Sequence, residues 1–225
     1  MNSDRWLVLG LGNPGDQYGS TRHNIGQMVI DYLASDVKFS NHKSKTQIAD
    51  IRVAGKAVVL AKTLGYMNES GVPTKALADF YKVSPANLIV IHDELDIDFN
   101  TIRIKQGGGD NGHNGLKSLT TNFASPEYFR LRMGIGRPQA PIDPADYVLK
   151  PFSQPEKKEL GDFIARGALA IERLIEKGLD YAQQEFNKQI SQYYVSRQQH
   201  RLLLKAAPYE LVDQCSHRLE LYGAR

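Results

Sequence analysis

Cysteine is almost absent from this sequence of 225 residues, because Cys215 is the only one. A single cysteine excludes an internal disulfide and a cysteine-rich metal site. Long hydrophobic runs are missing as well. The longest apolar stretches, such as residues 88–91, have the length of a strand and fall far short of the roughly 18 residues of a membrane span. The first residues show no basic segment followed by an apolar one, so we expect no secretory signal and a cytoplasmic location.

A strong excess of one charge is also lacking. The 28 basic and 25 acidic residues give a net charge of +3, and residues 188–225 account for that excess. Bulk charge therefore does not indicate a nucleic-acid-binding protein, and a polyanion would have to bind a local basic patch. The hydrophobic share of 41% is ordinary for a globular protein that buries a core.

Hydrophobic periodicity alternates between the spacing of strands and the spacing of helices along residues 1–187. It predicts strands over residues 5–9, 48–53, 57–61, 88–91, 102–105 and 129–135, and helices over 23–34, 70–81, 114–122 and 154–177. This alternation is typical of the α/β class, and we expect a single domain with a mixed, mostly parallel twisted sheet and helices on both faces. Residues 188–225 form an extension, partly helical or flexible, to which no function is assigned.

A glycine-rich segment, GLGNPG at residues 10–15, follows the first predicted strand. It matches the dinucleotide-binding pattern GxGxxG, which needs a helix to begin at the third glycine. Here seven residues separate Gly15 from the next helical pattern, and Pro14 lacks the N–H that such a loop would offer. No acidic residue ends a second strand about 20 residues on. A dinucleotide-dependent oxidoreductase therefore remains a weak alternative.

Polar residues stand where predicted strands end or helices begin, the edge at which an open α/β sheet binds its ligand. They are Asn13, His23, Asn68, Asp93 and Asn114. A histidine beside a carboxylate can take a proton from water, and carboxamides can bind a carbonyl oxygen and an amide N–H. The set is suited to hydrolysing an acyl bond, although each asparagine alone is equally typical of a turn or a helix cap.

A metal site is a further alternative for residues 92–96 (HDELD) together with His113. Adjacent residues of a strand point to opposite faces, so His92 and Asp93 are not expected to converge on one ion. We therefore expect no metal.

Five blocks, taken in order and spacing, resemble the family of bacterial peptidyl-tRNA hydrolases. They are GLGNPGDQYGSTRHNIG at residues 10–26, YMNESG at 66–71, HDELD at 92–96, the glycine-rich segment 107–117, and RLRMGIGRP at 130–138. The resemblance covers roughly residues 5–187. It implies a monomeric carboxylic ester hydrolase that needs no cofactor and cleaves the ester between a peptide and the 3′ end of tRNA.

The same resemblance implies the roles of individual residues. His23 is the general base and Asp93 is its carboxylate partner. The remaining residues of the crevice hold or line the acyl end of the substrate, and they are Asn13, Tyr18, Met67, Asn68, His113 and Asn114. Lys105 and Arg132 match positions that contact tRNA phosphates, and Arg103, Arg130 and Arg137 are neighbours on grounds of charge alone. Because Arg130 and Arg132 share one face of a predicted strand, we expect that face to meet solvent.

Three features depart from the family pattern. Gly65 stands where the family usually has threonine, which predicts a looser turn before Asn68. Asn100 replaces a glycine, an exchange that is tolerated if the residue has a positive φ. Residues 188–225 have no counterpart. A related domain that binds RNA or protein without catalysis is the main rival interpretation, and the presence of all five polar residues named above favours the enzyme.

Overall fold

The computed structural model describes residues 4–139 and 141–187, and over these residues seven strands form one sheet. The order across the sheet is β2-β3-β4-β1-β5-β7-β6. The strands are β1 (Trp6–Gly10), β2 (Ser40–His42), β3 (Thr46–Val53), β4 (Lys56–Thr63), β5 (Leu88–Glu94), β6 (Ile102–Gln106) and β7 (Phe129–Gly134). The central strands β4, β1, β5 and β7 are parallel, whereas β2, β3 and β6 pair antiparallel. The predicted mixed α/β sheet is confirmed.

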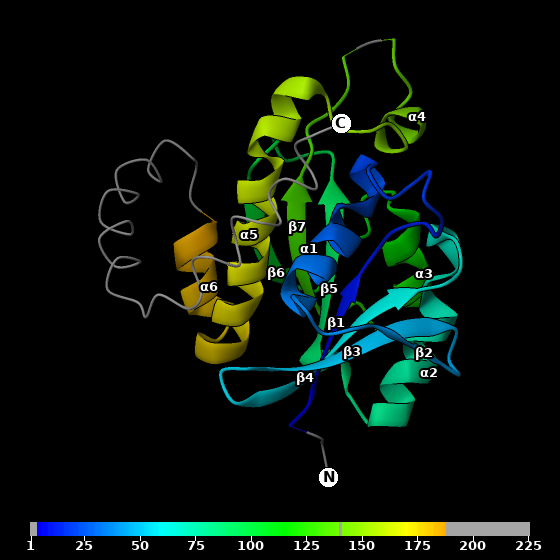
Figure 1. Ribbon diagram of the computed structural model, residues 1–225, viewed down its shortest axis with the longest axis vertical. Coiled ribbons are helices and arrows are strands. Elements are labelled where there is room, and N and C mark those ends of the chain that lie inside the picture. The colour runs from blue at the N-terminus through cyan, green and yellow to red at the C-terminus, as the bar shows by residue number, and fades with distance from the viewer. Residues whose placement is uncertain (1–3, 140, 188–225) are drawn as a thin grey trace.

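Helices cover both faces of the sheet (Figure 1). The α-helices are α1 (Ile25–Ala34), α2 (Gly71–Tyr81), α3 (Asn114–Phe123), α4 (Pro144–Val148), α5 (Gln154–Lys177) and α6 (Leu179–Phe186). Short 3₁₀ helices are η1 (Arg22–Asn24), η2 (Met67–Glu69) and η3 (Pro85–Asn87). One hydrophobic cluster lies between the sheet and α1, α5 and α6, and a second lies between the sheet and α2 and α3.

Close approach between α1 and the central strands depends on two glycines. A Cβ atom on Gly10 would lie 2.4 Å from the carbonyl oxygen of Gly26, and one on Gly26 would lie 2.4 Å from that of Ile91. Any side chain at either position would therefore push the start of α1 away from the sheet. The contact brings η1, directly before α1, to the end of the sheet where β1, β5 and β7 finish.

The edge strand β6 is covered by the residues around the end of α6. The Asn187 side chain accepts a hydrogen bond from the Ile104 N–H at 2.7 Å and donates to the Ile104 carbonyl oxygen at 3.1 Å. Gln183 donates to the same carbonyl oxygen at 2.9 Å. At Ile104 these bonds take the place of a neighbouring strand, so both backbone groups of this residue are paired at the sheet edge.

Several elements differ from the sequence prediction. The strand predicted over residues 88–91 continues to Glu94, because the polar end of β5 still pairs with β7. The elements β2, α4 and α6 were not predicted, and the first two are too short to show periodicity. The extension predicted over residues 188–225 lies outside the described residues, and its boundary stays a prediction.

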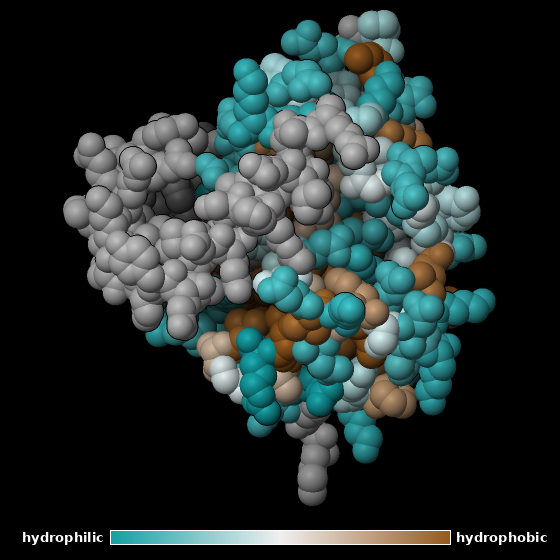
Figure 2. Space-filling model, viewed as in Figure 1, coloured by the Kyte–Doolittle hydropathy of each residue, from teal (hydrophilic) through white to brown (hydrophobic). Residues whose placement is uncertain are grey.

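In the view of Figure 2 the visible upper part of the molecule, around α4, is mainly hydrophilic, and hydrophobic residues gather lower down, near the end of α1. Among the helices of the described part of the chain, none combines the length and apolar character needed to cross a membrane.

Candidate active site

His23 and Asp93 are in hydrogen-bond contact at the end of the sheet where β5 finishes. His23 lies in the short helix η1, and its Nδ1 is 2.9 Å from Oδ1 and 3.1 Å from Oδ2 of Asp93, which lies near the end of β5. The Asp93 side chain is 3% exposed and that of His23 is 12% exposed. A carboxylate only accepts hydrogen bonds, so Nδ1 carries the proton and the Nε2 lone pair is left for another partner.

A second imidazole, that of His113, contacts the same carboxylate. His113 precedes α3, and its Nδ1 accepts hydrogen bonds from the N–H groups of Gly115 at 3.1 Å and Leu116 at 3.4 Å. Its Nε2 must therefore carry the proton, which it donates to Asp93 Oδ1 at 3.0 Å. The start of α3 thus sets the tautomer of His113, and His113 in turn holds Asp93.

Burial and charge shift the pKa values of His23 and Asp93 in opposite directions. Burial alone would lower the pKa of His23, but the charge and hydrogen bond of Asp93 outweigh it, and the pKa lies above its usual value. Burial alone would raise the pKa of Asp93, but the imidazoles of His23 and His113 hold it well below its usual range. Asp93 is therefore ionised at neutral pH, and His23 is a stronger base than a free histidine.

Asn13 is held in one orientation beside this cluster. Its Oδ1 accepts a hydrogen bond from the Met67 N–H at 2.8 Å, which fixes the opposite atom, Nδ2, as the donor that remains for a ligand. The backbone of Asn13 exchanges two hydrogen bonds with the Asn24 side chain, at 2.9 and 2.8 Å. Sequence reasoning missed Asn24, although it lies directly after His23, because no local pattern indicates a partner 11 residues away.

The structure places the other predicted substrate residues on two elements that pack together, η2 and α3. Asn68 and Asn114 are exposed, and Met67 is buried. A Cβ atom on Gly115 would lie 2.6 Å from the Met67 sulfur and 3.1 Å from His113, so the glycine brings these residues together. Tyr18 lies on neither of these elements and is half-buried in the turn before η1.

The antiparallel strands β6 and β7 carry four cations on one face of the sheet. Arg103 lies opposite Arg132, and Lys105 lies opposite Arg130. Arg132 donates from Nε to Glu94 at 3.0 Å and keeps some exposure, while burial and the nearby charges of Arg132 and Arg130 lower the pKa of Lys105. Lys105 and Arg132 therefore form a partly exposed basic patch close to the Asp93 end of β5.

Arg130 corrects the prediction that this face meets solvent. It is 0% exposed, and its two terminal nitrogens donate to the carbonyl oxygens of Gly108 and Gly109. Its guanidinium lies over the Tyr128 ring, 4.8 Å from the ring centre. Arg130 thus anchors the glycine-rich loop from within, because a guanidinium can bond two carbonyl groups at once. The shared-face pattern did not show that the loop folds over it.

The residues with metal-binding side chains at this site are His23, Asp93 and His113, whose ligand atoms lie within 4.8 Å of one another. The nitrogens that face Asp93 carry protons, and a metal would need their lone pairs instead. The donor set therefore fits a hydrogen-bonded cluster better than a metal ion. His92 lies on the opposite face, as expected, fully buried with Nδ1 2.7 Å from the Asp93 carbonyl oxygen, and burial followed by the charge of His113 lowers its pKa.

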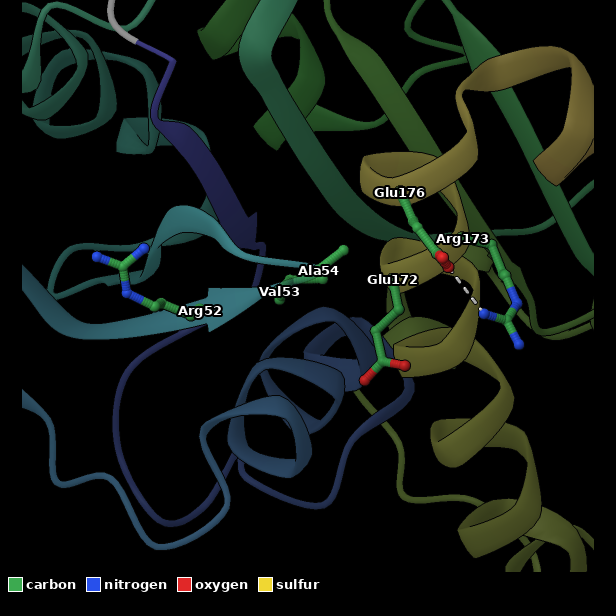
Figure 3. Close-up of a pocket in the computed structure, with 6 residues that line it drawn as sticks. All are labelled: Arg52, Val53, Ala54, Glu172, Arg173 and Glu176. Atoms are coloured by element: carbon green, nitrogen blue, oxygen red, sulfur yellow. Dashed lines mark hydrogen bonds and ion pairs between the residues drawn. The ribbon is translucent and has the colours of Figure 1, made fainter. Parts of the chain in front are cut away.

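A separate hollow of about 350 Å³ lies between the β3–β4 turn and the C-terminal half of α5 (Figure 3). Its lining residues are Arg52, Val53, Ala54, Glu172, Arg173 and Glu176. None of the candidate site residues lines it, and it is remote from the strand ends in Figure 1.

Asn100 replaces a glycine of the family pattern, an exchange that is expected to require a positive φ, and its φ is 69°. Gly65 has an ordinary φ, and the turn after it is held by the Glu69 N–H on the Tyr66 carbonyl oxygen at 2.9 Å. A Cβ atom on Gly65 would meet only the flexible Glu69 side chain. The missing threonine thus leaves the turn before Asn68 formed.

Comparison with known proteins identifies relatives over most of the chain. A family model described as peptidyl-tRNA hydrolase matches residues 7–193. The chain is 53% identical over 186 residues to a peptidyl-tRNA hydrolase of Rhodococcus erythropolis, covering 81% of this chain and 98% of the relative. It is 49% identical over 189 residues to that of Pseudarthrobacter chlorophenolicus, covering 82% and 96%.

A solved structure agrees with these relatives. The crystal structure of peptidyl-tRNA hydrolase from Acinetobacter baumannii is similar with a TM-score of 0.76 and 31% identity, covering 83% of this chain and 96% of that one. Because about half of the aligned residues are identical to those of such relatives and the fold is that of a solved member, this chain belongs to the peptidyl-tRNA hydrolase family.

Proposed function

We propose that His23, supported by Asp93, is the general base with which this enzyme hydrolyses the ester joining a peptide to the 3′ end of tRNA. The observation that carries the assignment is the orientation of His23. Its Nδ1–H is bound to a buried carboxylate, and its Nε2 lone pair is free to take a proton from water. The paired carboxylate stabilises the imidazolium that forms.

The attacked carbonyl needs a hydrogen-bond donor as its oxygen gains negative charge. Asn13 supplies one, because the Met67 N–H fixes its Oδ1 and leaves Nδ2 as the donor. Hydrolysis of an ester needs less assistance to its leaving group than hydrolysis of an amide, since a ribose alkoxide leaves more readily than an amine. One base and oriented carboxamides therefore suffice, without a serine nucleophile.

The exposed carboxamides of Asn68 and Asn114 account for a preference for peptidyl over free aminoacyl esters. A carboxamide can bond both the N–H and the C=O of a neutral peptide group. A free α-ammonium offers no acceptor and would lose hydration on entering the crevice. In this proposal the same crevice is lined by Tyr18, Met67 and His113. The tRNA phosphates are bound by Lys105 and Arg132, and such contacts do not depend on the base sequence of the RNA.

The decisive test is His23→Ala with N-acetyl-aminoacyl-tRNA as substrate. A positioned general base contributes roughly 10²- to 10⁴-fold, so turnover should fall by that factor while tRNA binding stays near normal. A variant that keeps more than about a tenth of the rate would remove His23 from the mechanism. The same assay with free aminoacyl-tRNA measures the substrate preference.

The enzyme is further proposed to act as a monomer in the cytoplasm and to need no metal. Activity should survive prolonged treatment with a chelator and stay unchanged when divalent zinc or magnesium is added back. Light scattering on the purified chain tests the monomer. Loss of activity on chelation, with recovery on adding one metal, would contradict the proton-based cluster.

A further inference from the structure

We propose that Arg22 is a positioning residue that keeps the His23 imidazole aligned with Asp93 by tying η1 to the start of α5. The inference rests on the proposed role of His23 as the base. It adds a residue that touches neither the substrate nor the reacting atoms in that mechanism.

Arg22 spans from η1 to a segment more than 125 residues later in the chain. Its Nη1 donates to the carbonyl oxygens of Lys150 at 3.2 Å and Pro151 at 2.8 Å, and its Nη2 donates to Glu156 Oε2 at 2.7 Å. The backbone N–H of Arg22 also donates to the Lys150 carbonyl oxygen at 3.2 Å. The side chain is only 7% exposed, so these bonds form away from solvent screening.

The surroundings of the guanidinium favour one geometry. It lies 4.1 Å from the ring centre of Tyr147, whose hydroxyl donates to the Ile135 carbonyl oxygen at 2.9 Å. Its carboxylate partner Glu156 also accepts the Ser153 N–H at 2.6 Å, in the capping box that begins α5. Burial opposes ionisation of Glu156, but these hydrogen bonds and the charge of Arg22 lower its pKa, so the pair stays charged.

The position of Arg22 makes this anchor relevant to His23. The helix η1 has three residues, and Arg22 and Asn24 flank His23 on either side. Asn24 is bonded to Asn13, and Arg22 is bonded to the α5 side, so the imidazole lies between two fixed neighbours. Asp93 belongs to β5 in the centre of the sheet and cannot follow if η1 moves.

A buried ion pair is weak evidence for added stability, because the free-energy cost of removing two charges from water offsets much of their attraction. Apolar side chains could fill the space between η1 and α5 just as well as Arg22 and Glu156 do. The guanidinium instead gives direction, because its Nη1 is bonded to two backbone carbonyl groups and its Nη2 to a carboxylate, an arrangement that lysine or glutamine cannot reproduce. A directional anchor next to the base is what precise alignment of Nδ1 with Asp93 requires.

The test compares Arg22→Gln and Glu156→Gln with a matched control, Arg173→Gln. Arg173 lies on the same helix as Glu156 and bonds Glu176 at 3.0 Å, away from the strand ends. For both test variants kcat should fall about 10-fold or more with KM nearly unchanged, since small misplacements of a catalytic group reduce rate by up to about 10²-fold. The control should keep wild-type kcat.

A double-mutant comparison separates positioning from a general structural effect. If Arg22 acts through His23, Arg22→Gln should add no further loss to the residual rate of His23→Ala. An equal loss in both backgrounds would overturn the inference, as would a folded Arg22→Gln or Glu156→Gln with kcat within about twofold of wild type. If Arg22→Gln does not fold, Glu156→Gln carries the test, because it keeps the bonds to the two carbonyl groups. High activity of His23→Ala alone would instead contradict the proposed function.

Discussion

The buried carboxylate of Asp93 accepts hydrogen bonds from two imidazoles, and these differ in the other hydrogen bonds that they make. Both ring nitrogens of His113 are bonded within the protein, because its Nδ1 accepts hydrogen bonds from the start of α3 and its Nε2 donates to Asp93. His23 uses only Nδ1 and keeps Nε2 available. In the proposed mechanism one of these histidines, His23, is therefore the base and the other supports the carboxylate, and the distinction comes from the backbone N–H groups of Gly115 and Leu116.

Replacing Asp93 with asparagine should change both the rate and its pH dependence. The raised pKa of His23 means that activity falls as pH drops through that value, because protonated His23 is no base. Without the carboxylate the pKa of His23 falls, so the acid limb of kcat/KM should move to lower pH. The plateau should fall roughly 10- to 10²-fold, less than for His23→Ala, since Asp93 orients the base but does not move the proton. An acid limb that stays in place would exclude Asp93 as the cause of the raised pKa.

Asn13→Asp tests the donor role of a carboxamide with little change in shape. The new carboxylate still accepts the Met67 N–H, so the turn at η2 should persist. It offers no N–H to the developing oxyanion, and kcat should fall by about 10² to 10³. Asn41→Asp, on the exposed strand β2, controls for the added charge and should be neutral. Wild-type kcat in Asn13→Asp would show that another group binds the oxyanion.

At the scale of elements, the loop between β6 and α3 is anchored to the sheet by an arginine of β7. Arg130 reaches from β7 to the carbonyl oxygens of Gly108 and Gly109, while Asn111 donates to Glu94 at 3.3 Å. The loop leads directly into His113. Its conformation therefore affects the support that His113 gives to Asp93.

Arg130→Met removes a fully buried guanidinium together with its bonds to the carbonyl oxygens of Gly108 and Gly109. The free energy of unfolding should fall by about 1–3 kcal/mol, measured by denaturant titration. Arg52→Met is the matched control, because Arg52 also donates to a glycine carbonyl, that of Gly55, but on an exposed turn. Equal stability of the two variants would mean that the buried anchor contributes nothing beyond a surface contact.

The basic patch of β6 and β7 should affect binding of the tRNA body and not the chemical step. Lys105→Ala and Arg132→Ala should raise KM for peptidyl-tRNA, keep kcat, and flatten the dependence of KM on salt, because fewer counterions are released. Lys75→Ala on α2, where the lysine is paired with Asp79, is the control.

A short substrate that carries only the 3′ end of tRNA separates the two roles. Its cleavage should be nearly unaffected by either change. Equal losses on the short and the full substrate would place Lys105 and Arg132 in the catalytic crevice. Arg132→Ala should also reduce stability, since it leaves the buried Glu94 without its cation.

At the scale of the whole molecule, the described body ends where the last sheet edge is covered. Asn187 bonds both backbone groups of Ile104, so this residue closes the fold on β6. A chain that ends at Asn187 should keep its unfolding temperature and bind tRNA almost as well as the full chain. Asn187→Ala in that shortened chain should lower the unfolding temperature, because the Ile104 N–H loses its acceptor. A large loss of tRNA affinity on shortening alone would identify residues 188–225 as an RNA-binding arm.

The sequence by itself determined the order of the main elements and the end of the sheet at which the site lies. Both follow from local information, since periodicity reports which side of a segment is buried, and strands followed by polar residues end at one edge. Resemblance to the family then named the residues. The φ of Asn100 was also predictable, because it depends on the local backbone.

Only the tertiary structure decided which polar groups face one another. His23 and Asp93 are 70 residues apart, Arg22 and Glu156 are 134 apart, and Arg130 is buried although its strand neighbour Arg132 is not. Periodicity places a side chain on a face but does not report what later covers that face. Hydrogen-bond partners across such separations are set when the helices pack on the sheet, and that packing gave His113 its tautomer and Arg22 its anchor.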